Sequence, residues 1–413
     1  MIVIIGAGLS GITAARLLKK PFVVLEKETV PGGLAAEYTA GGHRFGYGGH
    51  YFHFQNKGKI RKYLEEVRPF TKYRRDSRVL LDGRFIPFPI QFHLASLPAS
   101  VRKAILCEIL SRKPQDADDL EGFLLNQFGG RLYKLFFKPF LSKFYGRDLT
   151  EIMADMDKGS IPVPDVSQVR EGARGKKFLS AGYNPVFYYP AESMKDFIAA
   201  YAGPVAGKIR FGENVIGIDA EKKYVFTETD RYSYDRLVTT IPLKDLLAAW
   251  KVPGFRFPET ASADLDHIST VVVNAVLERK RRRFHWIYLP EKQFPFYRAG
   301  YYTSKGPVRC YLEKTVNPSN AFNRETVSEE AAVTLKGIGM IRDRREISFI
   351  DFRIIPVSYV VFNRHWQKTV PPTLASLERL GIYSIGRYGS WNYTSMSDDI
   401  QAAMQTAARL NSR

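Results

Sequence analysis

The sequence predicts an α/β protein in which a discontinuous dinucleotide-binding domain carries a helical insertion and an antiparallel β-sheet region. Three observations predict this arrangement. The chain opens on the apolar run Ile2 to Ile5, which leads into a G-x-G-x-x-G turn and an amphipathic helix. A central stretch repeats apolar residues at helical spacing, and a later stretch alternates β-branched residues at strand spacing.

The three glycines of the opening turn have distinct tasks. Gly6 permits the tight bend, Gly8 lets the backbone approach a pyrophosphate, and Gly11 lets helix and strand pack closely. The free N–H groups and the positive end of the helix then face the phosphates. About twenty residues on, the second strand ends in Glu26, where a carboxylate binds ribose hydroxyls. This Rossmann-like pattern predicts FAD or NAD rather than NADP; a strand–helix turn without ligand is the alternative.

Two further glycine segments favour FAD. The turn Pro31 to Gly33 follows soon after Glu26. In flavoproteins with two dinucleotide-binding segments such a turn lies along the pyrophosphate, and NAD dehydrogenases usually lack it. Gly46 to Gly49 then provide a pliable backbone that can pass close to a flat ring system. His50 follows, although a single histidine is more often structural than catalytic.

The composition restricts the location and the chemistry. A chain of 413 residues suggests two or three domains. Cys107 and Cys310 cannot make a disulfide framework and lack metal-ligand spacing, so no metal site is expected and a reducing cytoplasm fits best. No apolar run reaches membrane-spanning length, and the strand beginning at Ile2 leaves no room for a cleaved signal.

The formal net charge of +19 could attract nucleic acid, an anionic membrane surface or a phosphorylated substrate. The densest basic run, Arg279 to Arg283, is interpreted as a solvated hairpin loop. No nucleic-acid-binding motif accompanies it, so no nucleic-acid partner is expected. Peripheral contact with a membrane is left open and is not predicted.

The pattern divides the chain into three domains, of which the first is discontinuous. The FAD-binding domain is expected to comprise residues 1–55, 190–245 and 370–413. The largely helical insertion covers residues 56–189 and includes a hairpin with Asp82-Gly83 at its turn. Residues 246–369 are expected to form an antiparallel sheet with substrate contacts. The segment ending at Pro242 is expected to return to the parallel sheet.

Three later motifs are more specific than any single glycine turn. They are GGH at Gly48 to His50, WIYLPEKQFPFYRA at Trp286 to Ala299, and GRYGSWNY at Gly386 to Tyr393. With the opening turn they resemble FAD proteins of the amine oxidase and protoporphyrinogen oxidase group. The sequence is more closely similar to the UDP-galactopyranose mutases, particularly the eukaryotic-type enzymes, in the same order along nearly the whole chain.

The resemblance implies how the cofactor is held. His50 would lie under the isoalloxazine ring, Arg387 would lie beside it, and backbone groups of Ser395 and Met396 would meet its pyrimidine edge. The other implied cofactor-binding residues are Gly6, Ala7, Gly8, Ser10, Gly11, Glu26, Lys27, Gly32, Gly33, Leu34, Gly48, Gly49 and Val215.

The resemblance also implies a substrate site. Arg298 and Tyr393 would hold a diphosphate with Tyr288 beside them, and Trp286 would line the channel; His50 completes the implied catalytic set. A guanidinium fork suits a phosphate, which supports the assignment of Arg298.

The substrate side departs from the family pattern. Ser160 stands where the mutases carry a diphosphate-binding arginine, and Lys158, Arg170 or Arg174 could supply the missing charge. The family's YPARGG is here YPAESM, Tyr189 to Met194. These changes surround the substrate rather than the FAD.

The resemblance leaves three functions to compare. The first is FAD-dependent, non-redox ring contraction between the pyranose and furanose forms of a nucleotide-diphosphate sugar, which requires reduced flavin and so an external reductant. The alternative is an FAD-dependent oxidase or desaturase with an apolar tunnel. The third is a protein that keeps FAD without turnover, for which Ser160 is the main support.

Overall fold

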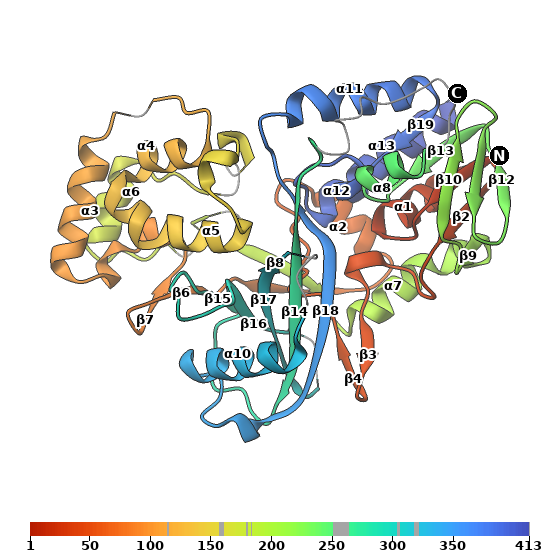
Figure 1. Cartoon of the computed structure of the whole chain (residues 1–413). Coiled ribbons are helices and arrows are strands. Elements are labelled where there is room, and N and C mark those ends of the chain that lie inside the picture. Colours follow the sequence, from red (N-terminus) through yellow and green to blue (C-terminus); the bar gives the residue numbers. More distant parts are fainter. Residues whose placement is uncertain are drawn as a thin grey trace.

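The computed structural model describes residues 1–113, 115–156, 161–178, 181–182, 184–250, 264–303, 306–317 and 322–412. Figure 1 shows a dinucleotide-binding part that holds both termini, a helical lobe on the opposite side, and a long sheet between and below them. The predicted α/β fold class, with helices and a separate antiparallel sheet, is confirmed.

The dinucleotide-binding part is built on a five-stranded sheet whose strands all run parallel. Its order is β19 (Ile382–Ser384), β13 (Arg236–Thr239), β1 (Ile2–Ile5), β2 (Phe22–Glu26) and β9 (Ile209–Phe211). β13 pairs with β1 in register Ile2 to Arg236, so the return strand predicted before Pro242 is formed. All four residues of β1 are buried, as expected for a strand covered on both faces.

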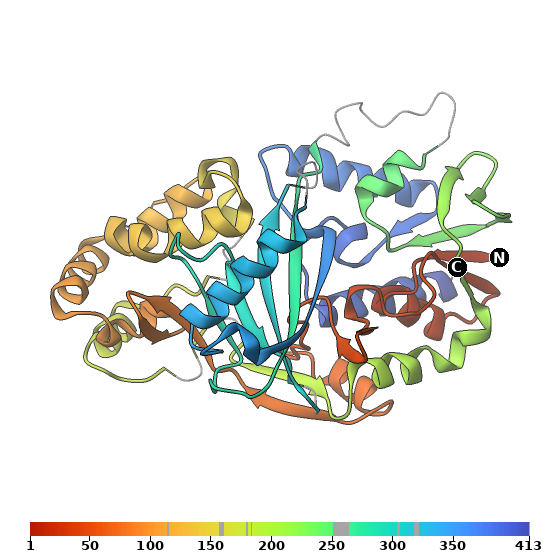
Figure 2. The same cartoon turned by 60° about the horizontal axis from the view of Figure 1, so that its bottom comes forward.

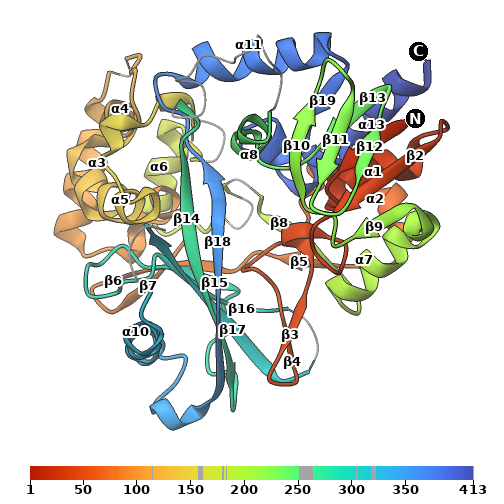
Figure 3. The same cartoon turned by 45° about the vertical axis from the view of Figure 1, so that its right-hand side comes forward.

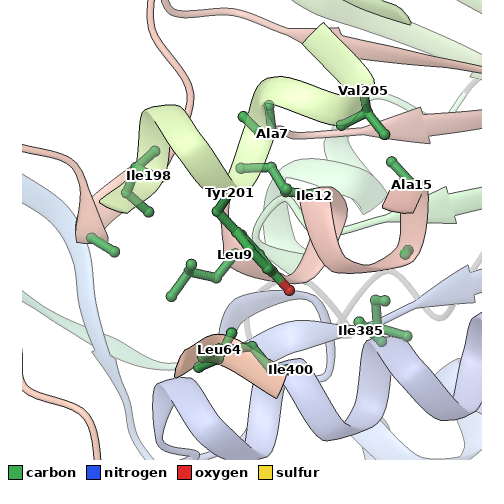
Figure 4. Packing of buried hydrophobic residues seen from close by; sticks show 14 of the residues in the cluster. Ala7, Leu9, Ile12, Ala15, Leu64, Ile198, Tyr201, Val205, Ile385 and Ile400 are labelled. Atoms are coloured by element: carbon green, nitrogen blue, oxygen red, sulfur yellow. The ribbon is translucent and has the colours of Figure 1, made fainter. Parts of the chain in front are cut away.

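The two faces of this sheet are covered by different elements, as Figure 3 shows from the side. One face packs against α1 (Leu9–Leu17), α7 (Met194–Ala202), α13 (Met396–Ser412) and α2 (Gly58–Glu65). Figure 4 shows this core, in which Ile12, Leu64, Tyr201 and Ile400 come together from these four helices. The opposite face is covered by β10 (Val215–Asp219), β11 (Tyr224–Thr227), β12 (Arg231–Ser233), α8 (Leu243–Ala248) and α11 (Trp366–Arg379).

The second large sheet has seven strands and is mostly antiparallel. Its order is β18 (Ile347–Val360), β14 (His267–Leu277), β17 (Val308–Val316), β16 (Arg298–Tyr301), β15 (Trp286–Tyr288), β6 (Ser77–Leu81) and β7 (Arg84–Pro87). Figure 2 shows α10 (Arg324–Gly337) lying across one face, where Leu335 and Val327 join the core.

This sheet differs from the expectation in two respects. The hairpin β6–β7, which turns at Asp82-Gly83, joins it through a parallel pairing of β6 with β15. The alternating patterns of ISFIDF and SYVVF predict two separate strands, but the structure has one strand, β18. The strand continues past Pro356 because a register irregularity there accommodates a residue without an N–H.

The basic run Arg279 to Arg283 is only partly solvated, contrary to the expectation. Arg281 binds Glu346 through two contacts of 2.8 Å, and both side chains are largely buried. The guanidinium of Arg282 lies over the Phe85 ring at 4.7 Å. Arg281 and Arg282 of this run are therefore held by contacts within the protein.

The helical lobe contains α3 (Ala99–Ser111), α4 (Leu120–Leu132), α5 (Lys138–Tyr145) and α6 (Val166–Ala173), with a π-helical turn at Tyr133–Phe137. The sequence predicts that the aromatic residues of this lobe belong to its core rather than to the cofactor site, and they pack together in the core of the lobe. α4 begins after Asp119, whose carboxylate accepts a hydrogen bond from Gly122 N at 2.8 Å. α2, from the same predicted insertion, packs instead beneath α1, and the domain boundaries stay a prediction.

Smaller elements connect these parts. They are β3 (Tyr38–Ala40) paired with β4 (His43–Phe45), β5 (Phe70–Arg74) paired with β8 (Val186–Pro190), and the short α12 (Gly386–Gly389). A search of the described helices finds none with the length and apolar character to cross a membrane.

Candidate functional site

Three glycine turns from distant parts of the sequence meet beside the start of α1. Gly32 N donates to Ala7 O at 2.8 Å, and Gly32 forms a parallel bridge with Gly8. The C-terminal turn arrives on the other side, where a Cβ at Gly386 would lie 2.6 Å from Ser10 Oγ. The predicted cofactor residues of the three turns are therefore brought together.

The opening turn leaves room for a phosphate. A Cβ at Gly11 would lie 1.9 Å from Gly6 O, so only glycine allows this helix to approach the strand. Gly6 has a φ of +96°, which side chains disfavour. A Cβ at Gly8, the N-cap of α1, would have no described atom within 4 Å. The first-turn N–H groups of α1 can thus receive a phosphate there.

Glu26 lies at the end of β2, where the ribose is expected. Its carboxylate accepts hydrogen bonds from Ala7 N at 2.6 Å and Glu28 N at 2.9 Å, and the residue is 6% exposed. Burial raises the pKa of Glu26, and the two hydrogen bonds oppose that rise. An ionised carboxylate can accept about four hydrogen bonds, so two acceptor positions of Glu26 remain for ribose hydroxyls. Lys27 is the next residue in the sequence. The N–H of Glu213 donates to Glu26 O at 2.9 Å, and Val215, two positions after Glu213, begins β10.

A cavity lies between these turns and the seven-stranded sheet. It encloses about 890 Å³ of empty space, including the open solvent at its mouth. The predicted site residues that line it are Leu34, Gly49, His50, Arg298, Arg387, Tyr393, Ser395 and Met396. Six tyrosines also line it, namely Tyr47, Tyr51, Tyr297, Tyr359, Tyr388 and Tyr393.

Arg387 lies on one wall of this cavity. Its guanidinium carbon is 4.7 Å from the centre of the Tyr393 ring and 4.8 Å from that of Tyr359. Nη1 approaches Thr394 O at 3.5 Å, while Nε and Nη2 are buried and lack a hydrogen-bond partner among the described residues. Buried donors without partners are costly, so their presence indicates a site for an acceptor.

Arg298 also lines the cavity and is already paired. Its Nε and Nη2 donate to the carboxylate of Glu313 at 2.5 and 2.7 Å. The side chains of Arg298 and Glu313 are 19% and 5% exposed. Nη1 of Arg298 has no bonded partner in the described ranges, so one edge of the guanidinium remains available to a ligand.

The glycines before His50 are required by the protein's own side chains. A Cβ at Gly48 would lie 2.5 Å from Glu313 Oε1, and one at Gly49 would lie 2.3 Å from the Tyr311 hydroxyl. Tyr311 and Glu313 are two positions apart and so lie on the same face of β17, close to this turn. The sequence suggested close approach by a ring system; in the structure these two side chains approach the turn.

His50 is neutral where it lines the cavity. Its Nδ1 is buried without a described partner. Burial lowers the pKa of His50 to about 4, and the charges of Arg387 and Arg298 act in the same direction. His50 therefore adds no positive charge at neutral pH.

Other predicted residues lie away from the cavity wall. Trp286 donates from Nε1 to the Tyr288 hydroxyl at 2.9 Å, and its ring stacks on that of Tyr51, a lining residue, at 5.6 Å; Trp286 and Tyr288 are not among the lining residues. Lys158 and Ser160 lie outside the described residues. Arg170 and Arg174 are not among the described residues that line the cavity.

One predicted flavin contact is engaged within the protein. The Ser395 N–H and hydroxyl both donate to Asp398 Oδ2, at 2.9 and 2.6 Å. This arrangement caps the start of α13. Of the two backbone groups predicted to meet the flavin, that of Met396 therefore remains available.

The sequence reasoning missed Glu313. Its signal was the alternation in VRCYLEK, which places Glu313 on the face opposite the buried Cys310 and Leu312. A carboxylate on a buried strand requires a charged or hydrogen-bonding partner, and Arg298 on the neighbouring strand is that partner.

Comparison with known proteins places this geometry in a known fold. Residues 4–67 match the family model described as an NAD(P)-binding Rossmann-like domain. A crystal structure of reduced UDP-galactopyranose mutase superimposes with a TM-score of 0.91 at 23% identity, covering 99% of this chain and 93% of that chain.

Two oxidases are also similar. A putrescine oxidase variant redesigned in its cofactor binding gives a TM-score of 0.69 at 14% identity, covering 100% of this chain and 99% of that one. Cyclohexylamine oxidase from Brevibacterium oxydans gives 0.68 at 14% identity, covering 100% and 98%. The chain therefore has the fold of these mutase and amine oxidase structures, and the resemblance seen in the sequence is confirmed at the level of the fold.

Proposed function

We propose that the protein binds FAD and catalyses a non-redox ring isomerisation, between pyranose and furanose, of a nucleotide-diphosphate sugar. The observation that carries the proposal is Arg387, whose buried Nε and Nη2 lack partners among the described residues in a cavity beside the glycine turns. An anionic group or an electron-rich ring would satisfy these donors. The fold shared with UDP-galactopyranose mutase supports the same assignment.

The cofactor half of the proposal rests on the three glycine turns. The open space at Gly8 would hold the pyrophosphate at the start of α1, and Glu26 would bind the ribose hydroxyls. Leu34, His50 and Met396 would surround the ring system, since they line the adjoining cavity. The chemistry at the anomeric carbon would belong to the flavin in its reduced form, so a reductant from outside the chain would be required.

The substrate half rests on the two arginines. Departure of a nucleoside diphosphate requires cations that hold its developing charge. Arg387 and the free Nη1 edge of Arg298 line the cavity and would bind the diphosphate, with Tyr393 beside them. Tyr288 and Trp286 would act behind Tyr51 rather than by direct contact. The assignment of Lys158 to the substrate site rests on the sequence alone.

The assay that tests this proposal uses dithionite-reduced protein. We expect the purified protein to be yellow and, once reduced, to interconvert a hexopyranose and a hexofuranose linked to a nucleoside diphosphate, followed by chromatography of several sugar nucleotides. Arg298→Ala should weaken sugar-nucleotide binding and leave the flavin content intact. Activity confined to the oxidised state, with release of hydrogen peroxide, would exclude the isomerase.

A second candidate function is an FAD-dependent oxidase. Glu313 compensates the charge of Arg298, and six tyrosines line the cavity, which suits a weakly charged substrate. The amine oxidases that share the fold support this alternative. Oxygen consumption with uncharged substrates would distinguish it from the isomerase.

A further inference from the structure

The charge of the cavity depends on one carboxylate. Arg298 and Glu313 face each other across β16 and β17 and form a bidentate pair, with the Glu313 side chain 5% exposed. Among the described residues, the charged side chains that line the cavity are Arg298, Arg387 and Glu313. Their formal charges sum to one positive charge. Without Glu313 the lining would carry two.

The two histidines that line the cavity leave the sum of the lining charges unchanged. Burial lowers the pKa of both His50 and His53 to about 4, so both are neutral at pH 7. Asp399 is not among the lining residues; its carboxylate accepts a hydrogen bond from Thr394 Oγ1 at 2.6 Å and interacts electrostatically with Arg387 from outside the lining. The strong positive charge of the whole chain therefore does not continue into the cavity.

We propose that Glu313 is a specificity-determining residue that sets how much negative charge the cavity accepts. Glu313 holds the Nε–Nη2 edge of Arg298 and cancels its charge, while the Nη1 edge still faces the ligand. The inference rests on the proposed function only in taking this cavity as the binding site. Arg387 then supplies the net positive charge of the lining, and a doubly charged anion is bound less tightly than it would be if Arg298 were also unpaired.

Removal of the Glu313 charge should increase the affinity of the cavity for doubly charged anions. Glu313→Gln keeps the shape of the side chain and one acceptor, but it leaves Arg298 as a buried cation without a counter-charge. An anion in the cavity would then supply the missing charge. At a separation of a few ångströms and the intermediate dielectric of such sites, the gain is about tenfold or more in affinity.

The test measures binding of inorganic pyrophosphate and inorganic phosphate to the flavin-loaded protein by calorimetry. We expect E313Q to bind pyrophosphate about tenfold more tightly than the wild type, with a larger preference for pyrophosphate over phosphate. The matched control is Glu330→Gln. Glu330 pairs with Lys314 of β17 at 2.7 Å, outside the cavity, so its removal should leave both affinities unchanged.

Two further variants keep the test decisive if E313Q does not fold. Arg298→Gln leaves Glu313 uncompensated and should weaken pyrophosphate binding about tenfold. The double variant R298Q/E313Q removes both charges and should restore the wild-type preference. Unchanged or weaker pyrophosphate binding in E313Q, or a double variant that behaves like R298Q, would overturn the inference.

The outcome is separable from that of the proposed function. These measurements use inorganic anions and no sugar nucleotide. Failure of the ring-isomerisation assay with a tenfold gain in E313Q would refute only the isomerase. Isomerase activity with unchanged anion binding in E313Q would refute only the role of Glu313.

Discussion

The guanidinium carbon of Arg387 lies 4.7 Å from the centre of the ring of Tyr393, which is six positions later in the sequence. Tyr359, from β18, is 4.8 Å from the same carbon and stacks with Tyr393 at 6.0 Å. The two rings hold the arginine in place without neutralising it. The guanidinium is thereby held in a fixed position in the cavity, where an anion or a flavin would accept hydrogen bonds from its unpartnered nitrogens.

Replacement of Arg387 should therefore separate stability from binding. A buried cation with two unbonded nitrogens costs stability, so Arg387→Met should raise the free energy of unfolding of the ligand-free protein by about 1 to 2 kcal/mol. Flavin or nucleotide affinity should fall. Urea unfolding and equilibrium flavin binding would measure the two effects.

The matched control for this variant is Arg16→Met. Arg16 also lies over a tyrosine ring, at 4.7 Å from Tyr201, but its nitrogens bind Tyr201 O at 2.8 Å and the Tyr63 hydroxyl at 3.1 Å. Because this arginine is satisfied, its loss should lower stability. Destabilisation of the same size in R387M would contradict the interpretation of Arg387 as an unsatisfied group.

Two glycines of the opening turn should respond differently to alanine. A Cβ at Gly11 would lie 1.9 Å from Gly6 O, so Gly11→Ala should destabilise the protein by about 3 kcal/mol or more. A Cβ at Gly8 meets no described atom within 4 Å, and its φ of −71° suits alanine. Gly8→Ala should therefore fold normally and lose dinucleotide binding. Thermal unfolding and flavin content would test both, and a G8A protein with full flavin content would exclude the pyrophosphate from this position.

Much of the nucleotide-binding part could be predicted because its signals are local. The turn from Gly6 to Gly11 and the acid at Glu26 follow from short-range backbone requirements, and the structure has the expected strand, turn and helix. The pairing of β6 with β15 joins residues more than 200 positions apart, and no local pattern encodes it. The patterns ISFIDF and SYVVF predict two strands, but a register irregularity near Pro356 keeps β18 continuous.

The residue types of the candidate site could be predicted from the sequence, but the pairing of Arg298 with Glu313 could not. The motif around Arg298 indicates a phosphate-binding guanidinium, whereas the antiparallel register sets Glu313 directly opposite. That register depends on the whole sheet. The same holds for Trp286, whose ring faces Tyr51 instead of the cavity because of the packing of β15 against the Gly49 to Tyr51 segment.

The stability of the protein should fall between pH 7 and pH 5. Burial lowers the pKa of His50 and His53 to about 4, from 6.5 in the unfolded chain, so their stabilising effect is present above 6.5 and is lost as the pH falls toward 4. Asp399 opposes this, since burial raises its pKa to about 6 and its protonation stabilises the native state. The net loss at pH 5 should be about 2 kcal/mol.

Urea unfolding at pH 7 and pH 5 would measure this dependence. His53→Asn should remove most of the net loss, because the share of one histidine is nearly as large as the net loss that remains once Asp399 has offset the other. A protein that is equally stable at both values, with H53N indistinguishable from the wild type, would mean that neither histidine is held neutral by the fold.

Trp286 should report occupation of the cavity. Its ring is 7% exposed and stacks on Tyr51 at an interplanar angle of 16°, and Tyr51 lines the cavity, so a bound ligand that shifts Tyr51 changes the surroundings of the indole. We expect UDP to quench the intrinsic fluorescence of the wild type. Trp286→Phe should lose most of this quenching, whereas Trp391→Phe should retain it, because Trp391 is fully buried beneath the wall against His267. Quenching that persists in W286F and disappears in W391F would place the nucleotide nearer to the Gly386 to Tyr393 turn than to Tyr51.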